Sequence, residues 1–230
     1  MFEIQDLPTG RLLADFSLWS SDLTNLAGEI RRTEPFADMY HLDVADGDFV
    51  PSLLFFPDLV AALRPLTQKP FHVHLMTTNP ADLIDDFADA GADIITIHYE
   101  NADRDDVLAQ IRAKGISTGL AIQLETPIES AVEYFNQVDA FVLMGTRLGI
   151  KGVGLDDEAC PRIAKLRSLL KREGLPGKIK IQGDGGIRDH TVPQLRLAGA
   201  DIITPGSLAF KSPDLLETTL WLRSLPGPTN

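Results

Sequence analysis

Four ionisable side chains in three short apolar segments have the types and spacing that metal-assisted acid–base chemistry needs. His41 and Asp43 are two residues apart, as are His72 and His74, and this spacing places side chains on one face of a strand. Asp184 ends another apolar segment and precedes two glycines. Imidazole and carboxylate together favour Zn²⁺, Fe²⁺, Mn²⁺ or Co²⁺ over Mg²⁺ or Ca²⁺. We therefore predict one divalent ion, of any of these four metals, held by His41, Asp43, His74 and Asp184.

The other histidines have different expected environments. A single inward-facing histidine is more often a hydrogen-bonded part of the core than a ligand, and His72 lies one layer deeper than His74, so we interpret His72 as structural. His98 ends the next apolar segment. It could lie behind the metal ligands and support them, or it could be part of the core, and the sequence does not decide between the two. His190 is expected on the solvated surface near a helix start.

Glycine-rich turns follow three of the later apolar segments and indicate an anion site. Glycine lets backbone N–H groups approach an anion closely, and a helix N-terminus adds its dipole. One turn glycine alone is weak evidence, whereas three such turns in neighbouring loops carry more weight. The predicted phosphate-binding residues are Gly149, Gly152, Gly185, Gly186, Gly206 and Ser207.

These residues need a scaffold, and the 230-residue chain alternates strand and helix patterns throughout. Alternation implies a parallel sheet, and eight units with no leftover domain favour a single closed (β/α)8 TIM barrel over residues 1–230. The first connection also lacks the G-x-G-x-x-G turn of a dinucleotide site. Residues before Thr9 are expected to cover the barrel floor, and the tail to fray from about residue 225. Strands are expected near 11–19, 38–44, 71–76, 93–99, 117–122, 139–144, 178–183 and 201–206; helical patterns include 23–32, 80–91, 104–115, 128–135, 157–174, 191–200 and 213–225.

Composition excludes several classes of protein. A content of 44% hydrophobic residues indicates a chain that buries a core, and the single cysteine, Cys160, excludes an internal disulfide. The net charge of −12 disfavours nucleic-acid binding. No apolar run reaches the ~18–20 residues that span a bilayer, and the start lacks the features of a secretory signal. We expect a cytoplasmic protein with neither nucleic acid nor membrane as a partner.

Long stretches of the chain resemble the ribulose-phosphate 3-epimerase family. HLDVADGDFVPSLLF is similar to its second-strand signature, VHLMTTNPADLIDDFADAGADIITIHYE to its third and fourth units, and FSLWSSDLTNLAGEI to its first. GDGGI and GADIITPGSLAFKSPD resemble its seventh and eighth units, so the resemblance runs from about Ser17 to Asp214. It implies a barrel of the ribulose-phosphate-binding type and a small-molecule ketose phosphate as substrate. It also implies a homo-oligomer.

The resemblance further implies a metal-dependent epimerase that inverts C3 of the ketose, foremost converting D-ribulose 5-phosphate to D-xylulose 5-phosphate. By position, Asp43 and Asp184 are the acid/base pair, Ser17 and His74 contact the substrate, and Met76 and Met144 line the site. Core filling is an equally good interpretation of the two methionines. The chemistry agrees with these residue types. A Lewis acid stabilises the cis-enediolate formed when C3 loses its proton, and inversion needs a proton-transfer group on each face.

The loop MGTRLGIKGVGL after the sixth expected strand departs from the family pattern. Arg147 and Lys151 add two cations there. Tighter phosphate binding, a more acidic substrate and solvated surface charge are three open interpretations of them. The departures leave the predicted metal ligands in place, so they put the sugar rather than the reaction in question. The residues that depart from the family pattern are Leu148, Ile150, Lys151 and Val153 in this loop, and Ala45, Asp48, Gln123 and Leu124 elsewhere.

Three alternatives remain beside the pentulose reaction. The same chemistry could act on another ketose phosphate such as D-allulose 6-phosphate. A non-catalytic sugar-phosphate-binding barrel would be expected to have lost an acid/base residue, and none is missing. Related decarboxylase barrels have a D-x-K-x-x-D motif; Asp43 and Asp46 fit it, but Ala45 occupies the lysine position. Lys180 lies too early in its strand to form a Schiff base at the site.

Overall fold

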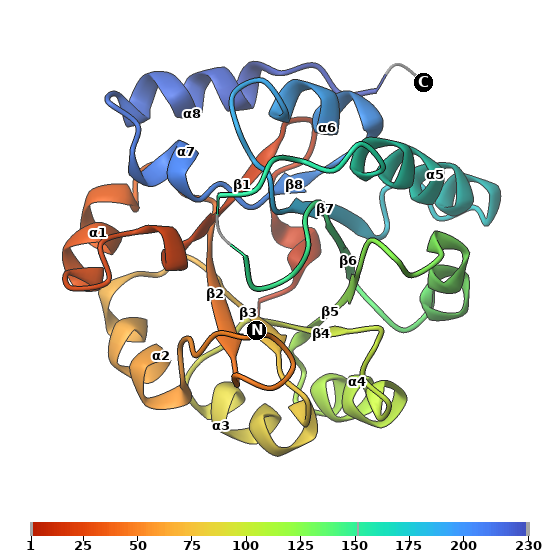
Figure 1. Cartoon of the computed structure of the whole chain (residues 1–230), viewed down its shortest axis with the longest axis horizontal. Helices are drawn as coiled ribbons and strands as arrows, with labels where there is room; N and C mark the ends of the chain where they lie inside the picture. The colour runs from red at the N-terminus through yellow and green to blue at the C-terminus, as the bar shows by residue number, and fades with distance from the viewer. Residues whose placement is uncertain (1, 151, 229–230) are drawn as a thin grey trace.

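The computed structural model describes residues 2–150 and 152–228. Eight parallel strands close into a barrel in sequence order, with helices around the outside (Figure 1). The predicted (β/α)8 barrel is therefore confirmed. The strands are β1 (Leu13–Ser17), β2 (Met39–Ala45), β3 (Phe71–Met76), β4 (Ile94–His98), β5 (Ser117–Ile122), β6 (Ala140–Met144), β7 (Lys180–Asp184) and β8 (Ile202–Ile203).

Helices fill the connections between strands, and two of them, α2 and the short α7, were not among the helical patterns named from the sequence. The last helix ends at Ser224, close to where the tail was expected to begin. The α-helices are α1 (Leu26–Thr33), α2 (Pro57–Leu63), α3 (Ile84–Asp89), α4 (Arg104–Ala113), α5 (Ala159–Arg172), α6 (Val192–Ala198), α7 (Ser207–Phe210) and α8 (Leu215–Ser224).

Two segments differ from the sequence expectation in kind or length. The helix expected over 128–135 is a 3-10 helix, η5 (Ile128–Tyr134). Its buried residues Ile128, Ala131 and Tyr134 are three apart, and a 3-10 helix places exactly that spacing on one face, whereas an α-helix would rotate it away. The last strand is only two residues long, Ile202–Ile203, although the Thr204 N–H still donates to Gly183 O of β7 at 3.0 Å and Pro205 O accepts from the Ser17 N–H of β1 at 3.3 Å before the turn into α7.

Successive residues of a strand point alternately outward to the helices and inward to the barrel interior, and on β2 and β3 this places most apolar residues outside and polar residues inside. On β2, Tyr40, Leu42 and Val44 join the main core cluster between strands and helices. The intervening residues, including His41 and Asp43, therefore point into the barrel. The same alternation on β3 sends Phe71, Val73 and Leu75 outward and its two histidines inward. The apolar cluster between the strands and the helices thus supplies the hydrophobic stabilisation, and the inward positions of these two strands are available for polar groups.

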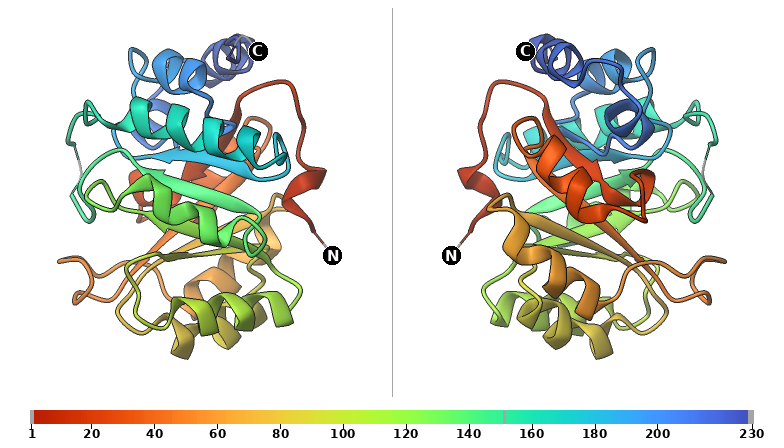
Figure 2. Two further views of the ribbon diagram at one scale, coloured as in Figure 1. Left: turned by 90° about the vertical axis from the view of Figure 1, so that its right-hand side faces the viewer. Right: turned by 90° about the vertical axis from the view of Figure 1, so that its left-hand side faces the viewer.

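The N-terminal segment closes the floor of the barrel, as expected from the sequence. It forms a short 3-10 helix, η1 (Ile4–Asp6), whose Ile4 is fully buried and donates its N–H to Ser117 Oγ at 3.2 Å. Figure 2 shows this segment at the opposite end of the barrel from the loops around residues 46–54, 145–150 and 152–155. The apolar floor cluster consists of Ile4, Leu7, Leu13, Met39, Ile94, Ala140 and Ile202, with Phe2 packed against it.

Each even-numbered strand starts directly after an aspartate that ties it to the preceding strand. The aspartate donates its backbone N–H to a carbonyl of that strand, and its carboxylate accepts the N–H of the same residue. For Asp201 and Ile181 the two distances are 2.8 and 2.9 Å, and Arg167 also donates to the carboxylate at 2.6 Å. These four strand-start aspartates pair as Asp38 with Ala14, Asp93 with Phe71, Asp139 with Thr118 and Asp201 with Ile181.

Replacing a strand-start aspartate should lower the stability of the barrel. In Asp201→Ala the Ile181 N–H loses its acceptor inside the sheet, and we expect the free energy of unfolding to fall by about 1–3 kcal/mol. Denaturant unfolding would measure this. Asp189→Ala, at an exposed aspartate, is the control and should change stability by less than about 0.5 kcal/mol. Equal unfolding midpoints for the two variants would contradict this role.

Candidate metal and acid–base site

Two imidazoles and two carboxylates meet where β2, β3 and β7 end. His41 Nε2 lies 3.3 Å from Asp43 Oδ1 and 3.5 Å from Asp184 Oδ2. His74 Nδ1 lies 3.6 and 3.5 Å from the same two oxygens, and 3.3 Å from His41 Nε2. The structure thus brings together all four residues that the sequence analysis assigned to a metal, and we call them the four-residue group.

The spacing of these atoms fits a bound ion. Atoms that each lie about 2.0–2.2 Å from one Zn²⁺-sized ion in a tetrahedral arrangement are separated by about 3.3–3.6 Å. The five distances above fall in this range, and all four ligand atoms lie within 4.8 Å of one another. The chain therefore has a buried His/Asp group able to hold a metal ion.

The electrostatics of the group favour a positive charge at the same point. Burial lowers the pKa of His41, but Asp43 and Asp15 act against it, and the net pKa lies well above the ordinary histidine value. Burial raises the pKa of Asp43, yet the neighbouring His41 outweighs this and holds the pKa below its usual range. The field that retains a proton on His41 would equally stabilise a divalent cation between the carboxylates.

His74 is held from behind by a second histidine and a carboxylate. His98 Nε2 lies 2.9 Å from His74 Nε2, and His98 Nδ1 lies 3.3 Å from Glu100 Oε2. Glu100 in turn accepts hydrogen bonds from Thr126 and from the backbone of Gln123. Burial lowers the pKa of His98 to about 4, so its ring is neutral near pH 7. The structure thus places His98 behind the four-residue group, the first of the two environments that the sequence left open.

The inward residues of β1 support the group from the other side. Ser17 donates its hydroxyl proton to Asp43 Oδ2 at 2.8 Å. Asp15 lies one layer below, fully buried, with Oδ2 2.9 Å from His41 Nδ1 and 2.6 Å from His72 Nδ1. His72 is therefore part of the buried network, as predicted. Sequence reasoning missed Asp15, although its two-residue spacing from Ser17 was a usable signal.

A cavity of about 360 Å³ opens above the four-residue group. Asp43 and Asp184 lie in its lining, as do Ser17, Met76 and Met144. The methionines belong to two small apolar clusters, and Leu148 packs against both of them. Leu148 comes from the loop that departs from the family pattern, so this departure lies directly over the apolar wall of the cavity.

The residues predicted to bind phosphate also line this cavity. Gly149, Gly152, Gly185, Gly186, Gly206 and Ser207 all belong to its lining. Gly186 has a φ of 69°, and a Cβ added there would lie 2.7 Å from the backbone nitrogen of Leu155. A side chain would therefore force the loops after β6 and β7 apart. Ser207 starts helix α7, whose first N–H groups have no partner within the helix.

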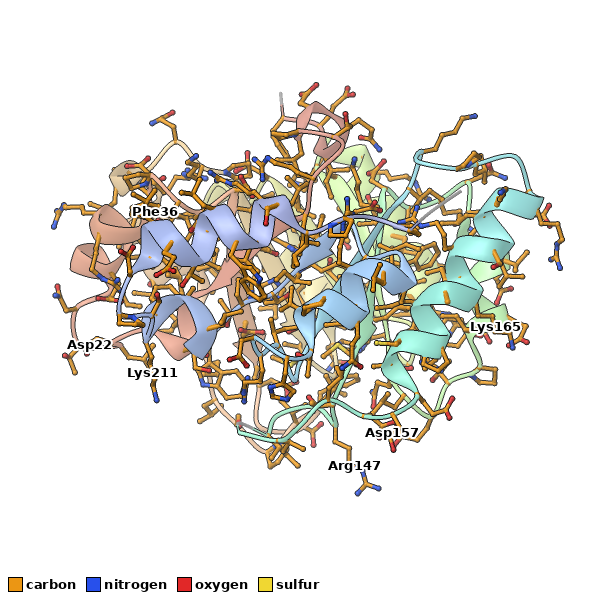
Figure 3. All side chains as sticks on the ribbon, turned by 90° about the horizontal axis from the view of Figure 1, so that it is seen from above. Asp22, Phe36, Arg147, Asp157, Lys165 and Lys211 are labelled. Atoms are coloured by element: carbon orange, nitrogen blue, oxygen red, sulfur yellow. The ribbon has the colours of Figure 1, made fainter. Side chains whose placement is uncertain are left out.

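Basic side chains surround the mouth of the cavity. Arg147, Arg188 and Lys211 are part of its lining, and Figure 3 shows Arg147 and Lys211 extending from the same side of the molecule. Arg147 is 81% exposed and lies 4.0 Å from Glu125, as solvated surface charge would. Lys151, the other added cation, lies outside the described residues. His190, with 75% of its side chain exposed, is on the surface as predicted.

Among residues 2–150 and 152–228, no helix is both long and apolar enough to cross a membrane.

Comparison with known proteins places the chain in a family. Residues 13–210 match the Ribulose-phosphate 3 epimerase family. The ribulose-phosphate 3-epimerase of Synechocystis sp. is 35% identical over 216 residues, which cover 92% of this chain and 93% of the relative. That of Treponema pallidum is 37% identical over 198 residues, covering 84% and 89%.

A solved structure with low sequence identity has the same fold. The 3-keto-L-gulonate-6-phosphate decarboxylase of Vibrio cholerae superposes with a TM-score of 0.70 at 15% identity, covering 92% of this chain and 95% of that one. At this identity the likeness concerns the barrel alone. The family match over residues 13–210 and the relatives above 30% identity cover most of the chain and therefore show the family as well as the fold. The chain is a member of the ribulose-phosphate 3-epimerase family, an isomerase of the epimerase class built on a (β/α)8 barrel.

Proposed function

We propose that the protein inverts C3 of a phosphorylated ketose, converting D-ribulose 5-phosphate to D-xylulose 5-phosphate. The observation that carries this proposal is the placement of Asp43 and Asp184, from different sides of the barrel, around one imidazole nitrogen at the bottom of the cavity. The family match supports the same reaction. Proton transfer next to a carbonyl needs such groups, whereas binding alone does not.

The two aspartates act as the proton-transfer pair. One carboxylate removes the proton from C3 on one face of the sugar, which leaves a planar cis-enediolate. The other, in its acid form, delivers a proton to C3 from the opposite face, so the configuration inverts and the two aspartates exchange protonation states. Ser17, through its hydrogen bond to Asp43 Oδ2, orients that carboxylate.

The four-residue group would hold one divalent ion, Zn²⁺, Fe²⁺, Mn²⁺ or Co²⁺, which supplies Lewis-acid stabilisation of negative charge on the C2 and C3 oxygens. His41 and His74 are neutral ligands, which leaves both carboxylate charges to offset the ion. Met76 and Met144 form an apolar wall that does not compete for protons.

The phosphate group of the substrate fits the glycine-lined end of the cavity. The backbone N–H groups of Gly186, Gly206 and Ser207 lie in the loops after β7 and β8, where barrels of this class bind phosphate. Backbone donors hold an anion without a fixed side-chain charge, which suits a protein with a net charge of −12.

The sugar itself is the open part of the proposal. Leu148 packs against the two apolar clusters that contain Met76 and Met144 and so changes the apolar wall of the cavity, which makes a ketose of another length, such as D-allulose 6-phosphate, the second candidate. Ala45 lies where a decarboxylase of this fold would place its lysine, and it has no proton to deliver. The homo-oligomer and the cytoplasmic location stay predictions.

Solvent-exchange labelling tests the reaction directly. Incubating the metal-loaded protein with D-ribulose 5-phosphate in D₂O should place deuterium at C3, because a carboxylate exchanges its proton with solvent between turnovers. Proton NMR would follow the loss of the C3 signal and the appearance of D-xylulose 5-phosphate. Exchange with D-allulose 6-phosphate alone would move the assignment to the longer sugar. No exchange with either ketose would contradict the proposed chemistry.

Removing either proton-transfer group should stop epimerisation. Asp43→Asn and Asp184→Asn are expected to lower kcat by at least ~10²–10⁴-fold, the usual contribution of a positioned acid or base. Steady-state assays on both pentulose phosphates would measure this, with metal content determined in parallel. Asp189→Asn, at an exposed carboxylate, should retain wild-type kcat. A variant at Asp43 or Asp184 that retains full activity would rule that residue out.

Metal removal should abolish activity reversibly. Dialysis against a chelator is expected to eliminate C3 exchange, and one equivalent of Zn²⁺, Mn²⁺, Fe²⁺ or Co²⁺ should restore it. His41→Ala should reduce the bound metal more than the ~10–100-fold affinity loss typical of an outer partner, since it removes a ligand. Elemental analysis would compare it with His190→Ala, which removes an exposed histidine. Equal metal content in these two variants would contradict the ligand assignment.

A further inference from the structure

A carboxylate lies buried in the middle of the barrel, one layer below the four-residue group. Asp15 has no exposed surface, although a buried charge is costly unless several hydrogen bonds satisfy it. One of its oxygens, Oδ2, accepts all of the hydrogen bonds given to its side chain. The donors come from three other strands and are His41 Nδ1 at 2.9 Å, His72 Nδ1 at 2.6 Å and Gln182 Nε2 at 2.9 Å.

Two of these donors are themselves fixed by further contacts. His72 Nε2 lies 2.7 Å from Thr96 Oγ1, so the ring bridges β1 and β4. Gln182 Nε2 also donates to Thr204 Oγ1 at 2.7 Å. Asp15 Oδ2 is therefore held at one point by side chains that cannot rotate without breaking a second bond. The third donor, His41, is the one whose orientation this fixed oxygen can determine.

The contact with Asp15 decides which nitrogen of His41 faces the cavity. A carboxylate accepts and does not donate, so Nδ1 of His41 must have the hydrogen in this contact. Nε2, with its lone pair, then points at Asp43, Asp184 and His74, which lie 3.3–3.5 Å away. An imidazole that donates one N–H to a carboxylate is a stronger ligand through its other nitrogen.

The register of the first two strands explains why β1 can do this. Ser17 lies beside His41 in the sheet, and Asp15 lies beside Met39. The inward pair of β1, Asp15 and Ser17, thereby reaches the inward pair of β2, with Asp15 bonded to His41 and Ser17 to Asp43. One strand thus orients two successive side chains of its neighbour.

We propose that Asp15 is a positioning residue for the metal site: it fixes the tautomer and orientation of His41 and strengthens His41 as a ligand for the divalent ion. This inference rests on the proposed function, because it requires an ion at the four-residue group. Asp15 itself does not touch the ion or the substrate. The remaining buried oxygen, Oδ1, accepts no hydrogen bond among the described residues, so burying this carboxylate carries a cost in stability.

The test compares two buried carboxylates of similar hydrogen bonding. Asp15→Asn removes the charge below the site, and Asp38→Asn does so at the opposite end of the barrel, where Asp38 accepts from Ala14 and Arg11. Competition with a chelating dye would give the Zn²⁺ dissociation constant of each variant. We expect Asp15→Asn to weaken Zn²⁺ binding ~10–100-fold and Asp38→Asn to leave it unchanged. Both variants should unfold more easily than the wild type.

A second readout keeps the inference testable if Asp15→Asn does not fold. Long-range proton–nitrogen NMR of the Zn²⁺-loaded wild-type protein should show His41 protonated at Nδ1 and metal-bound at Nε2. His41 with its proton at Nε2, or a Zn²⁺ dissociation constant unchanged in Asp15→Asn, would overturn the role of Asp15 while leaving the proposed reaction intact. A wild-type protein that binds no divalent ion would overturn both proposals together.

Discussion

Two carboxylates placed beside one imidazole nitrogen are the constraint on which the site depends. Asp43 and Asp184 repel each other in a buried setting, and only positive charge between them makes the arrangement stable. The same carboxylates raise the pKa of His41 above its ordinary value despite complete burial, and a divalent ion bound between them would replace the proton that this field favours. The barrel tolerates the arrangement because its hydrophobic stabilisation comes from the outer layer between strands and helices rather than from the interior.

The histidines of the site depend on layers of contacts behind them. His74 is followed outward by His98 and Glu100, and His41 is followed inward by Asp15. Each ring therefore has one nitrogen for the site and one for a buried partner. This division fixes the orientation of each ring by hydrogen bonding rather than by packing alone.

Much of this arrangement could be predicted from the sequence, because strand alternation and strand order determine where inward residues meet. The pairs His41/Asp43 and His72/His74 identified the inward faces of β2 and β3, and the glycine turns identified residues that line the cavity. For Asp15, the two-residue spacing from Ser17 indicated only which way the side chain faces. A single aspartate within an apolar strand does not reveal its partners, which come from β2, β3 and β7 and are known only once the barrel closes.

Local sequence patterns were less informative about the type of one helix and the end of one strand. The apolar residues at 128, 131 and 134 indicated a helix, and their three-residue spacing fits the 3-10 form that the structure shows. For β8, the sequence placed Pro205 and Gly206 in the strand, whereas the regular strand ends at Ile203 and only single hydrogen bonds of Thr204 and Pro205 continue to the neighbouring strands. In both cases the sequence predicted the correct position in the fold but not the hydrogen-bond pattern.

The strand-start aspartates have a consequence for how such a protein can change over time. They and the Ile4 floor lie at the amino ends of the strands, whereas every residue of the cavity lies at the carboxyl ends. Mutations in the loop that contains Leu148 can therefore alter the lining of the cavity without removing the hydrogen bonds that join the strands at the opposite end of the barrel. The site can thus diverge in sequence while the barrel itself stays stable.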